Sequence, residues 1–283
     1  MLDQQLIRRG FERAAAGFDE HDFLHCEIRA RLLDRLAAVR IDPRTVIDLG
    51  AGTGGAIPAL EARFPKASVL PIDLTRAMLA AGDMTGREIC ADAARLPLPD
   101  RSIDVAFSNL MLHHCPDPAA VLTETRRVLR PPGLLTFTTF GPNSLLELGR
   151  AWATADRFSH ISPFADMHNI GDALLRAGFA EPVIDSQVLT ITYGAVDSLV
   201  TDLRNAGSVN ATPERNRGLT GRTAAQRLRD ACQALADDDG RIPITIDIVF
   251  GIAWAGEKPS RPDPDGPIEV PIDRIGRSPG QRP

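Results

Sequence analysis

The chain has 283 residues, of which 43% are hydrophobic and 24% charged, an ordinary balance for a globular protein with a sizeable core. Its formal net charge of −5 argues against a protein that coats nucleic acid. No apolar run reaches the ~18 residues that a membrane span needs, and the N-terminus lacks the apolar core of a signal peptide. We therefore expect a cytoplasmic protein with neither nucleic acid nor a membrane as a partner. The four cysteines lie far apart without a CxxC pair, which disfavours a disulfide framework and a structural zinc site.

The first 40 residues predict a cap of two helices, separated by residues 17–22. In the second helix, apolar side chains recur at helical spacing and define one apolar face: Leu24, Ile28, Leu32, Leu33 and Leu36. We therefore expect residues 1–40 to form a helical cap that precedes the main domain.

From residue 44 to residue 140, short apolar strands alternate with helical segments. The predicted strands are 44–49, 68–73, 87–91, 103–110 and 134–140, and the predicted helices are 55–64, 75–81 and 118–129. Residues 130–133, Arg-Pro-Pro-Gly, predict a turn before the last of these strands. This alternation is typical of βαβ units, so the fold class is α/β with a parallel sheet.

Beyond residue 140 the rhythm changes. The sequence predicts helices at 144–157, 169–177, 196–206 and 223–236, and strands at 183–193 and 242–254. We therefore expect a main domain over residues 41–255, with helical insertions around 141–180 and 195–240. Residues 256–283 are rich in Pro, Gly, Asp and Arg, and they predict a disordered tail.

The strongest local motif is VIDLGAGTGG at residues 46–55, where a strand leads into a glycine turn and then a helix. Glycines in such a turn let a ligand approach the backbone closely. A dinucleotide fold uses GxGxxG, whereas Gly50, Gly52 and Gly54 give GxGxG. Asp48, just before the turn, would repel a pyrophosphate but would suit the ammonium and sulfonium groups of S-adenosylmethionine. The motif therefore favours S-adenosylmethionine over a dinucleotide.

Further polar residues follow the next strands. Asp73 ends the second predicted strand, where its carboxylate can accept hydrogen bonds from both ribose hydroxyls. Capping of the following helix is an alternative role for this residue. Asp92 follows the third strand and is placed to accept a hydrogen bond from an adenine amino group. Asn109 and Leu110 end the fourth strand, next to the expected methionine part of the cofactor.

As a set, residues 44–140 resemble the class I S-adenosylmethionine-dependent methyltransferases. The resemblance implies a Rossmann-like sheet of about seven strands, the last antiparallel, with helices on both faces. It also implies a set of cofactor-binding residues: Asp48, Gly50, Gly52, Gly54, Asp73, Leu74, Asp92, Ala93, Asn109, Leu110 and His113. Of His113 and His114, we expect one to line the methionine end of the site and the other to be structural. No metal is expected, because Cys115 is the only further ligand type nearby.

A narrower resemblance spans about residues 8–256. FERAAAGFDEH (11–21), GPNSLLEL (141–148), LTGR (219–222) and GRIP (240–243), with Trp152, His160 and Phe164, are similar to the malonyl-carrier-protein O-methyltransferases of biotin synthesis. That family usually has tyrosine where this chain has Phe18. The resemblance implies methyl transfer from S-adenosylmethionine to the free carboxylate of a malonyl thioester, carried on acyl carrier protein or on coenzyme A.

The chemistry that the resemblance implies needs little acid–base catalysis, because a carboxylate is already ionised at pH 7. Positioning of the oxygen and exclusion of water then supply the rate. We expect His21 and His160 to be donors near the acceptor and Phe18 to shield the cofactor. Helix capping is an alternative role for His21, and a structural turn is an alternative for His160. The acidic carrier predicts an arginine face, for which the candidates are Arg150, Arg157, Arg204 and Arg222.

Three other functions remain open at this point. The segment SHISPF (159–164) also resembles a segment of the arginine-modifying assembly factors of respiratory complex I. A small-molecule methyltransferase, of the quinone type, would use His113 or His114 as a base. A cofactor-binding scaffold without transferase activity is the third alternative.

Overall fold

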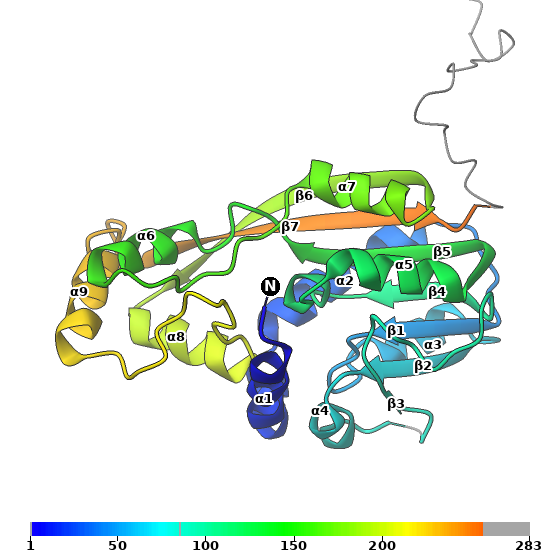
Figure 1. The fold of residues 1–283 in the computed structure, drawn as a ribbon, viewed down its shortest axis with the longest axis horizontal. Coiled ribbons are helices and arrows are strands. Elements are labelled where there is room, and N and C mark those ends of the chain that lie inside the picture. The colour runs from blue at the N-terminus through cyan, green and yellow to red at the C-terminus, as the bar shows by residue number, and fades with distance from the viewer. Residues whose placement is uncertain (1, 85, 257–283) are drawn as a thin grey trace, which may run out of the picture.

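The computed structural model describes residues 2–84 and 86–256, and its centre is a seven-stranded sheet (Figure 1). The strands are β1 (Thr45–Leu49), β2 (Ser68–Asp73), β3 (Ile89–Cys90), β4 (Ile103–Ser108), β5 (Leu129–Phe140), β6 (Ala180–Tyr193) and β7 (Ile242–Trp254). They are ordered β3-β2-β1-β4-β5-β7-β6, and β7 runs antiparallel to β5 and β6 while the other neighbours are parallel. The predicted α/β fold with an antiparallel last strand is confirmed.

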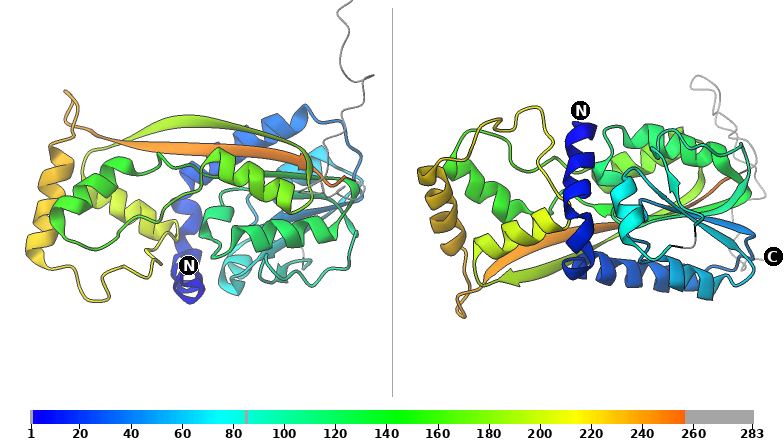
Figure 2. Two further views of the ribbon diagram at one scale, coloured as in Figure 1. Left: turned by 45° about the horizontal axis from the view of Figure 1, so that its top comes forward. Right: turned by 90° about the horizontal axis from the view of Figure 1, so that it is seen from below.

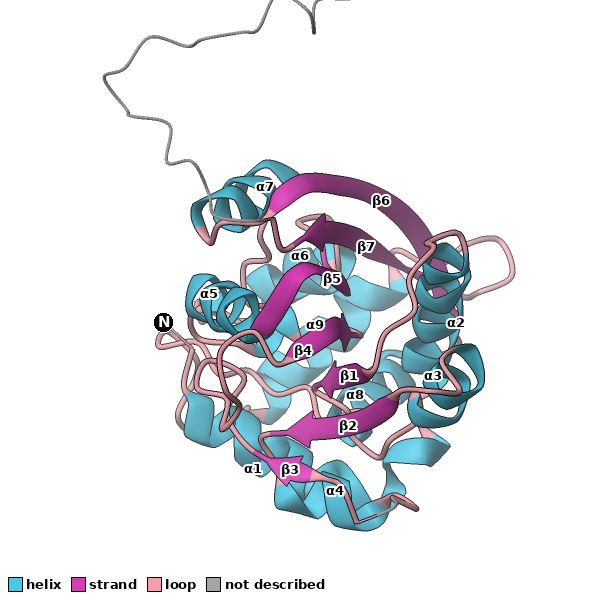
Figure 3. Cartoon of the chain, turned by 90° about the vertical axis from the view of Figure 1, so that its right-hand side faces the viewer, coloured by secondary structure: helices cyan, strands magenta, loops and turns pink. Residues whose placement is uncertain are grey.

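Helices cover both faces of this sheet. They are α1 (Gln4–Ala14), α2 (Phe23–Ala37), α3 (Ile57–Arg63), α4 (Arg76–Ala81), α5 (Pro118–Val128), α6 (Leu146–Ala155), α7 (Met167–Arg176), α8 (Val196–Asn205) and α9 (Arg222–Gln233), with short 3-10 helices η1 (Ala15–Glu20) and η2 (Leu112–His114). Helices α2 and α3 lie on one face of the sheet, and α5 and α7 lie on the other (Figure 3). None of the helices in the described segments is long and apolar enough to cross a membrane.

Two hydrophobic clusters, one on each face, hold these layers together. Successive strand residues alternate between them: Val46 packs in the cluster with α2 and α3, and Ile47 packs in the cluster with α5 and α7. The same alternation holds for Val105 and Ala106 in β4. Full burial of each large aliphatic side chain contributes roughly 1.5–3 kcal/mol, so a sheet buried on both faces accounts for the continuous apolar runs in the sequence.

The two last strands extend well beyond the parallel part of the sheet. Strand β5 pairs with β7 only from Ile248 to Trp254, whereas β6 pairs with β7 along its whole length. Residues 242–247 therefore form a two-stranded projection with β6, on which α6, α8 and α9 pack (Figure 1). Helix α1 crosses between α8 and the parallel part of the sheet (Figure 2).

Two predicted boundaries need correction. Residues 130–133 do not form a separate turn, because β5 already begins at Leu129 and these residues bulge out of its pairing with β4. The helix predicted from residue 144 starts at Leu146, because Leu145 has a φ of 60° and donates its N–H to the Thr245 carbonyl at 2.8 Å. The tail predicted at 256–283 lies, beyond Gly256, outside the described residues.

Candidate active site

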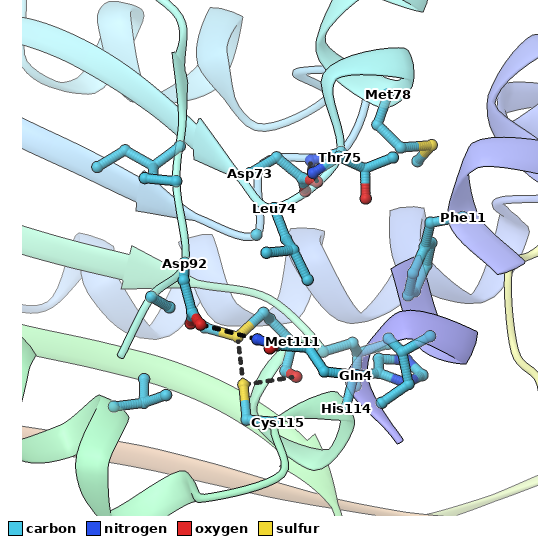
Figure 4. A pocket seen from close by; sticks show the side chains of 18 of the residues that line it. Gln4, Phe11, Asp73, Leu74, Thr75, Met78, Asp92, Met111, His114 and Cys115 are labelled. Atoms are coloured by element: carbon cyan, nitrogen blue, oxygen red, sulfur yellow. Dashed lines mark hydrogen bonds between the residues drawn. The ribbon is translucent and has the colours of Figure 1, made fainter. Parts of the chain in front are cut away.

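The main cavity lies at the carboxyl ends of β1, β2 and β4, where the strand order reverses between β1 and β4. It has a volume of about 250 Å³ and is covered by α1 and η1. Figure 4 shows Asp73 and Asp92 along one side of it, and Phe11 of α1 with His114 on the other, where their ring centroids lie 5.0 Å apart. No arginine or lysine is among its lining residues in the described part of the chain. A ligand with phosphates is therefore disfavoured, whereas a cationic or neutral ligand fits.

The glycine turn is held in a conformation that side chains would not tolerate. Gly50 and Gly52 have φ angles of 74° and 59°, in the left-handed region. A Cβ on Gly50 would lie 2.4 Å from Cγ of Met111, so glycine is also required there for space. Gly54 lies behind the turn, against Met84, and does not line the cavity.

Asp73 ties the turn to the start of α4. Its two carboxylate oxygens accept the N–H groups of Thr75 at 2.7 Å and of Gly52 at 3.0 Å. Burial raises the pKa of Asp73, and these two hydrogen bonds oppose the rise. A carboxylate offers about four lone-pair positions, so two acceptor positions remain for a ligand's hydroxyl groups.

Asp92 lies at the other end of the cavity, beside Ala93 (Figure 4). It accepts a hydrogen bond from the backbone N–H of Ala94 at 2.9 Å and another from the side-chain amide of Gln4 at 2.8 Å. Gln4 belongs to α1, so this contact connects the covering helix to the floor of the site. The sequence carried no local pattern that pointed to Gln4. Leu74, the predicted contact directly after β2, also lines the cavity.

Asp48 lines a small adjoining cavity of about 40 Å³ together with Phe18, His25, Arg29 and Asn109, which we call the Asp48 cavity. The Asp48 side chain is only 2% exposed, and burial raises its pKa to about 7, with the positive charge of Arg29 opposing the rise. A carboxyl group and a guanidinium group thus face the same small space. This pair has the charges that an amino acid's ammonium and carboxylate groups require.

Asn109 and Leu110 are fixed at the end of β4 by Thr138. The Thr138 hydroxyl donates to Oδ1 of Asn109 at 2.9 Å and accepts the Leu110 N–H at 2.9 Å. The Asn109 amide also donates to the carbonyl of His25 at 3.0 Å. Both predicted residues line the main cavity, and these contacts leave their positions well defined.

Phe18 and His25 pack together between the main cavity and the Asp48 cavity, and both line each of them. Phe18 is 7% exposed, and its ring centroid lies 5.1 Å from that of His25. Nδ1 of His25 is buried and has no hydrogen-bond partner within residues 2–84 and 86–256. Burial lowers the pKa of His25 to about 4, so the ring is neutral at pH 7. In the sequence, His25 is an inconspicuous position of an amphipathic helix.

The histidine pair after β4 divides between two cavities. His114 lines the main cavity, and both rings line a neighbouring cavity of about 110 Å³, which we call the His113 cavity. His113 stacks on Phe140 with ring centroids 4.3 Å apart, and it does not line the main cavity. Burial lowers the pKa of His114 to about 3 and that of His113 well below its ordinary range, so both rings are neutral. The residue of the pair that reaches the cofactor side is thus His114. Within the described residues, no group of three His, Cys, Asp or Glu side chains could hold a metal.

His160 and His21, the two predicted donors, lie in different surroundings. His160 lines the His113 cavity, stacks on Trp152 at 3.6 Å between ring centroids, and has its Nε2 2.9 Å from a carboxylate oxygen of Asp156. His21 has its ring nitrogens 3.3 Å from Asp202 and 2.9 Å from the Asn205 amide, and it lines none of the cavities described here. It joins the segment before α2 to α8.

The chain is similar to known methyltransferases over its core and over nearly its whole length. Residues 47–137 match a methyltransferase domain family. The chain is 40% identical to a malonyl-[acyl-carrier protein] O-methyltransferase of Halorhodospira halophila, over 98% of this chain and 96% of that protein. It is 42% identical to the protein of the same name from Laribacter hongkongensis, over 93% of this chain and 94% of that protein. The likeness therefore extends over the N-terminal helices, the sheet and the helices that pack around it.

Solved structures share the fold at much lower sequence identity. The YcgJ protein of Bacillus subtilis superposes with a TM-score of 0.59 at 17% identity, over 82% of this chain and 99% of that one. A protein of Bacillus halodurans gives a TM-score of 0.57 at 18% identity, over 82% of this chain and 100% of that one. These likenesses concern the fold alone.

Proposed function

Because the chain belongs to the malonyl-[acyl-carrier protein] O-methyltransferase family, we propose that it methylates the free carboxylate of a malonyl thioester carried by an acyl carrier protein. The methyl donor is S-adenosylmethionine, and the product is the methyl ester that the sequence resemblance places early in biotin synthesis. The observation that carries the proposal is the pairing of two adjoining cavities. The main cavity is acidic at both ends and suits the donor, and the His113 cavity adjoins it at Ile7 and His114.

The acidic residues of the main cavity and the Asp48 cavity would hold the cofactor. The free acceptor positions of Asp73 suit the ribose hydroxyls, and Asp92 suits the adenine amino group. Asp48 and Arg29 have the charges that suit the ammonium and carboxylate groups of the methionine part. When bound, S-adenosylmethionine supplies an electrophilic methyl group. Among the residues described, no arginine or lysine lines the main cavity, so no positive side chain of its lining would repel the sulfonium.

The acceptor carboxylate needs orientation more than activation, because it is ionised at pH 7. His113 and His114 are neutral, so they can donate a hydrogen bond without forming an ion pair that would weaken the nucleophile. His160 is oriented by Trp152 and Asp156 on the far side of the same cavity. Phe11, Phe18 and Phe140 exclude water around these groups, which strengthens the remaining electrostatic interactions.

Phe18 is consistent with this assignment although the family usually has tyrosine there. Its ring fills the space between the glycine turn and Met78, and it shields the two cavities from solvent. A carboxylate nucleophile requires no proton transfer, so a tyrosine hydroxyl at this position is not required for the chemical step.

The test is transfer of a labelled methyl group to malonyl-acyl carrier protein, with acetyl-acyl carrier protein as the matched control. Transfer to the malonyl form alone, released again by mild ester hydrolysis, is the expected result. Tight cofactor binding without transfer to any malonyl thioester would overturn the proposal and leave only the methyltransferase fold. Transfer to protein arginine or to a small phenol instead would identify another acceptor.

A further inference from the structure

The main cavity and the His113 cavity belong to a series of three that reaches the protein surface. The third, which we call the Arg215 cavity, has a volume of about 290 Å³. It shares His160, Val209 and Asn210 with the His113 cavity, which in turn shares Ile7 and His114 with the main cavity. Its other lining residues include Gly218 and Thr220, which are exposed. The series therefore runs from the glycine turn, past the histidines, to an opening beside the 206–221 loop.

Charge is distributed unevenly along this series. Arg13, in the last turn of α1, and Arg215 both line the outer cavity, whereas no arginine or lysine lines the main or His113 cavities within the described ranges. Arg215 is held in place: its guanidinium donates to the Thr212 carbonyl at 3.2 Å and lies 3.9 Å from the Asp3 carboxylate. Arg13 is exposed and forms no ion pair with any described residue. The opening thus presents two guanidinium groups at the start of a route toward the cofactor.

Asn210 lies where the outer and middle cavities meet, and its conformation is fixed. Its Oδ1 accepts hydrogen bonds from the backbone N–H of Thr212 at 3.1 Å and from the Thr212 hydroxyl at 2.7 Å. Its amide donates to the carbonyl of Ser159, directly before His160. These contacts attach the 206–221 loop to the segment that carries His160. The boundary between the two cavities therefore consists of groups that hold one another in position.

We propose that Arg13 and Arg215 bind the phosphate of a phosphopantetheine arm, whose chain passes Asn210 and His160 to place its terminal malonyl group beside His113 and His114. This assignment rests on the proposed function, because it presumes an acceptor held at the end of such an arm. Guanidinium groups match the geometry of phosphate oxygens and can bind them with two parallel hydrogen bonds. The narrower, apolar part of the route then receives the uncharged pantetheine chain, and only the terminal carboxylate reaches the neutral histidines.

The same surface offers a contact for the body of the carrier protein. Leu219 stands between two residues that line the Arg215 cavity, and its side chain is 98% exposed. Arg217 and Arg222, on either side of it in the sequence, are exposed as well. An acidic carrier with its arm inserted in the cavity would cover this rim. Of the arginines expected from the sequence, Arg222 lies on this rim. Arg150, Arg157 and Arg204 line none of these cavities.

The experiment compares three malonyl thioesters with each variant: malonyl-acyl carrier protein, malonyl-coenzyme A, and malonyl-pantetheine, which lacks the phosphate. Loss of a charge-assisted hydrogen bond weakens binding by about 10- to 100-fold. For Arg13→Gln and Arg215→Gln we therefore expect KM to rise by about that factor with the first two substrates. With malonyl-pantetheine, kcat/KM should stay within about twofold of the wild type, because the lost contact was never formed. Arg215→Lys should recover part of the affinity.

Two control variants separate the arm from the carrier body. Arg9→Gln removes an exposed arginine of the same helix as Arg13 that lines none of the cavities, and it should change no parameter. Leu219→Asp should raise KM for the carrier protein and leave malonyl-coenzyme A unchanged. The phosphate site is wrong if Arg13→Gln, which breaks no ion pair within residues 2–84 and 86–256, affects the substrates with and without phosphate equally or affects neither.

A binding measurement distinguishes failure of this inference from failure of the proposed function. Holo-acyl carrier protein carries the arm without malonate, and apo-acyl carrier protein carries no arm. Binding of the holo form should be weakened by Arg13→Gln while binding of the apo form stays the same. If the wild-type protein methylates malonyl thioesters but binds holo and apo forms equally, the arm site is overturned and the function stands. If it methylates none, yet the holo form binds more tightly than the apo form in an Arg13-dependent manner, the function fails and the arm site stands.

Discussion

The two sides of the site are built in different ways. On the cofactor side, each carboxylate lies at or near the carboxyl end of a strand: Asp48 in β1, Asp73 at the end of β2, and Asp92 two residues after β3. On the acceptor side, the walls come from segments that lie far apart in the chain. Ile7, His114, His160 and Asn210 surround two adjoining cavities although α1, η2 and two separate loops supply them. The parallel strands fix the first set, and the contacts of α1 with α4 and α8 fix the second.

This difference predicts which substitutions affect cofactor binding and which affect the acceptor. The cofactor side depends on backbone geometry that parallel pairing enforces, so single polar side chains can be changed there while the fold is retained. The acceptor side depends on the placement of α1 and of the 206–221 loop, which are joined by the hydrogen bond from the Asp3 N–H to the Ala211 carbonyl at 2.9 Å. Changes to side chains that line only the His113 or Arg215 cavity should therefore alter acceptor kinetics and leave cofactor affinity intact, whereas changes to the carboxylates of the cofactor side should do the reverse. Helix α1 borders both sides, because Gln4 and Phe11 line the main cavity.

The largest effect on cofactor affinity is expected from Asp73→Ala. Removal of the carboxylate deletes two acceptor positions for the ligand and leaves the N–H groups of Gly52 and Thr75 unpaired. Since a hydrogen bond to a charged group contributes about 1.5–3 kcal/mol, cofactor affinity should fall by about 100-fold or more. Isothermal titration with S-adenosylhomocysteine measures the change. Asp117→Asn is the matched control, because Asp117 lines the same cavity but caps α5 through the Ala120 N–H, a role that asparagine also fills. Equal losses for the two variants would contradict the assignment of Asp73.

Acid pH should destabilise the region where the two halves meet, because His25, His113 and His114 are buried there as neutral rings. Their pKa values in the folded state lie below the ordinary value of 6.5, so the unfolded chain takes up protons first as pH falls. The stabilisation is complete above pH 6.5 and is lost as pH falls toward 4, by about 1.4 kcal/mol per pH unit for each histidine. Urea unfolding at pH 7.5 and 5.5 measures the loss.

Two variants separate the contribution of the histidines to the pH dependence of stability from the opposing contribution of Asp48. Asp48 has a raised pKa, so it gains a proton in the folded state first, and its contribution to stability grows as pH falls from about 7 toward 3.8. Asp48→Asn should therefore make the acid loss steeper, and His25→Gln should make it shallower. An unchanged pH dependence in His25→Gln would show that this ring is not buried in its neutral form.

The same contrast explains what could be predicted from the sequence. The α/β class, the seven-stranded sheet with its antiparallel last strand and the family are confirmed, because the glycine turn and the alternation of apolar residues are local patterns that the fold retains. The roles of Asp48, Asp73 and Asp92 remain predictions, although Asp73 and Asp92 line the main cavity and Asp48 lines the small cavity beside it. The division into a cap at 1–40 and a domain at 41–255 also remains a prediction.

The parts that sequence reasoning missed depend on contacts between distant segments. Gln4 reaches Asp92 only because α1 packs across α4, and neither residue type marks that pairing. Arg13 and Arg215 differ from the other arginines in lining a cavity that exists only when the 206–221 loop is folded. His21 and His160 looked alike as candidate donors, and only the position of α8 shows that His21 is taken up by Asp202 and Asn205.

A moderate effect, confined to the acceptor side, is expected from His160→Phe. Phenylalanine keeps the stacking on Trp152 but removes the polar edge that faces Asp156 and the His113 cavity. Loss of one orienting hydrogen bond should lower kcat/KM for malonyl-acyl carrier protein by about tenfold. Cofactor affinity should not change, and His21→Phe should leave both the affinity and kcat/KM within about twofold. A parallel fall in cofactor affinity for His160→Phe would show that the two sides are less separate than the structure indicates.

The smallest expected effect is the release of a fraction of a proton from Asp48 when the cofactor binds. The pKa of Asp48 is raised to about 7, so about half of the free protein carries a proton on this carboxyl group at pH 7. If the ammonium group of the cofactor lies beside it, binding lowers this pKa and releases up to about half a proton at pH 7, but little at pH 8.5. Titration in phosphate and in Tris, whose ionisation enthalpies differ, measures the release as a difference in apparent binding enthalpy. Asp48→Asn should bind without that difference. Equal apparent enthalpies for the wild type in both buffers at pH 7 would place the ammonium group away from Asp48, and Arg29 would then remain as the residue that holds the methionine end.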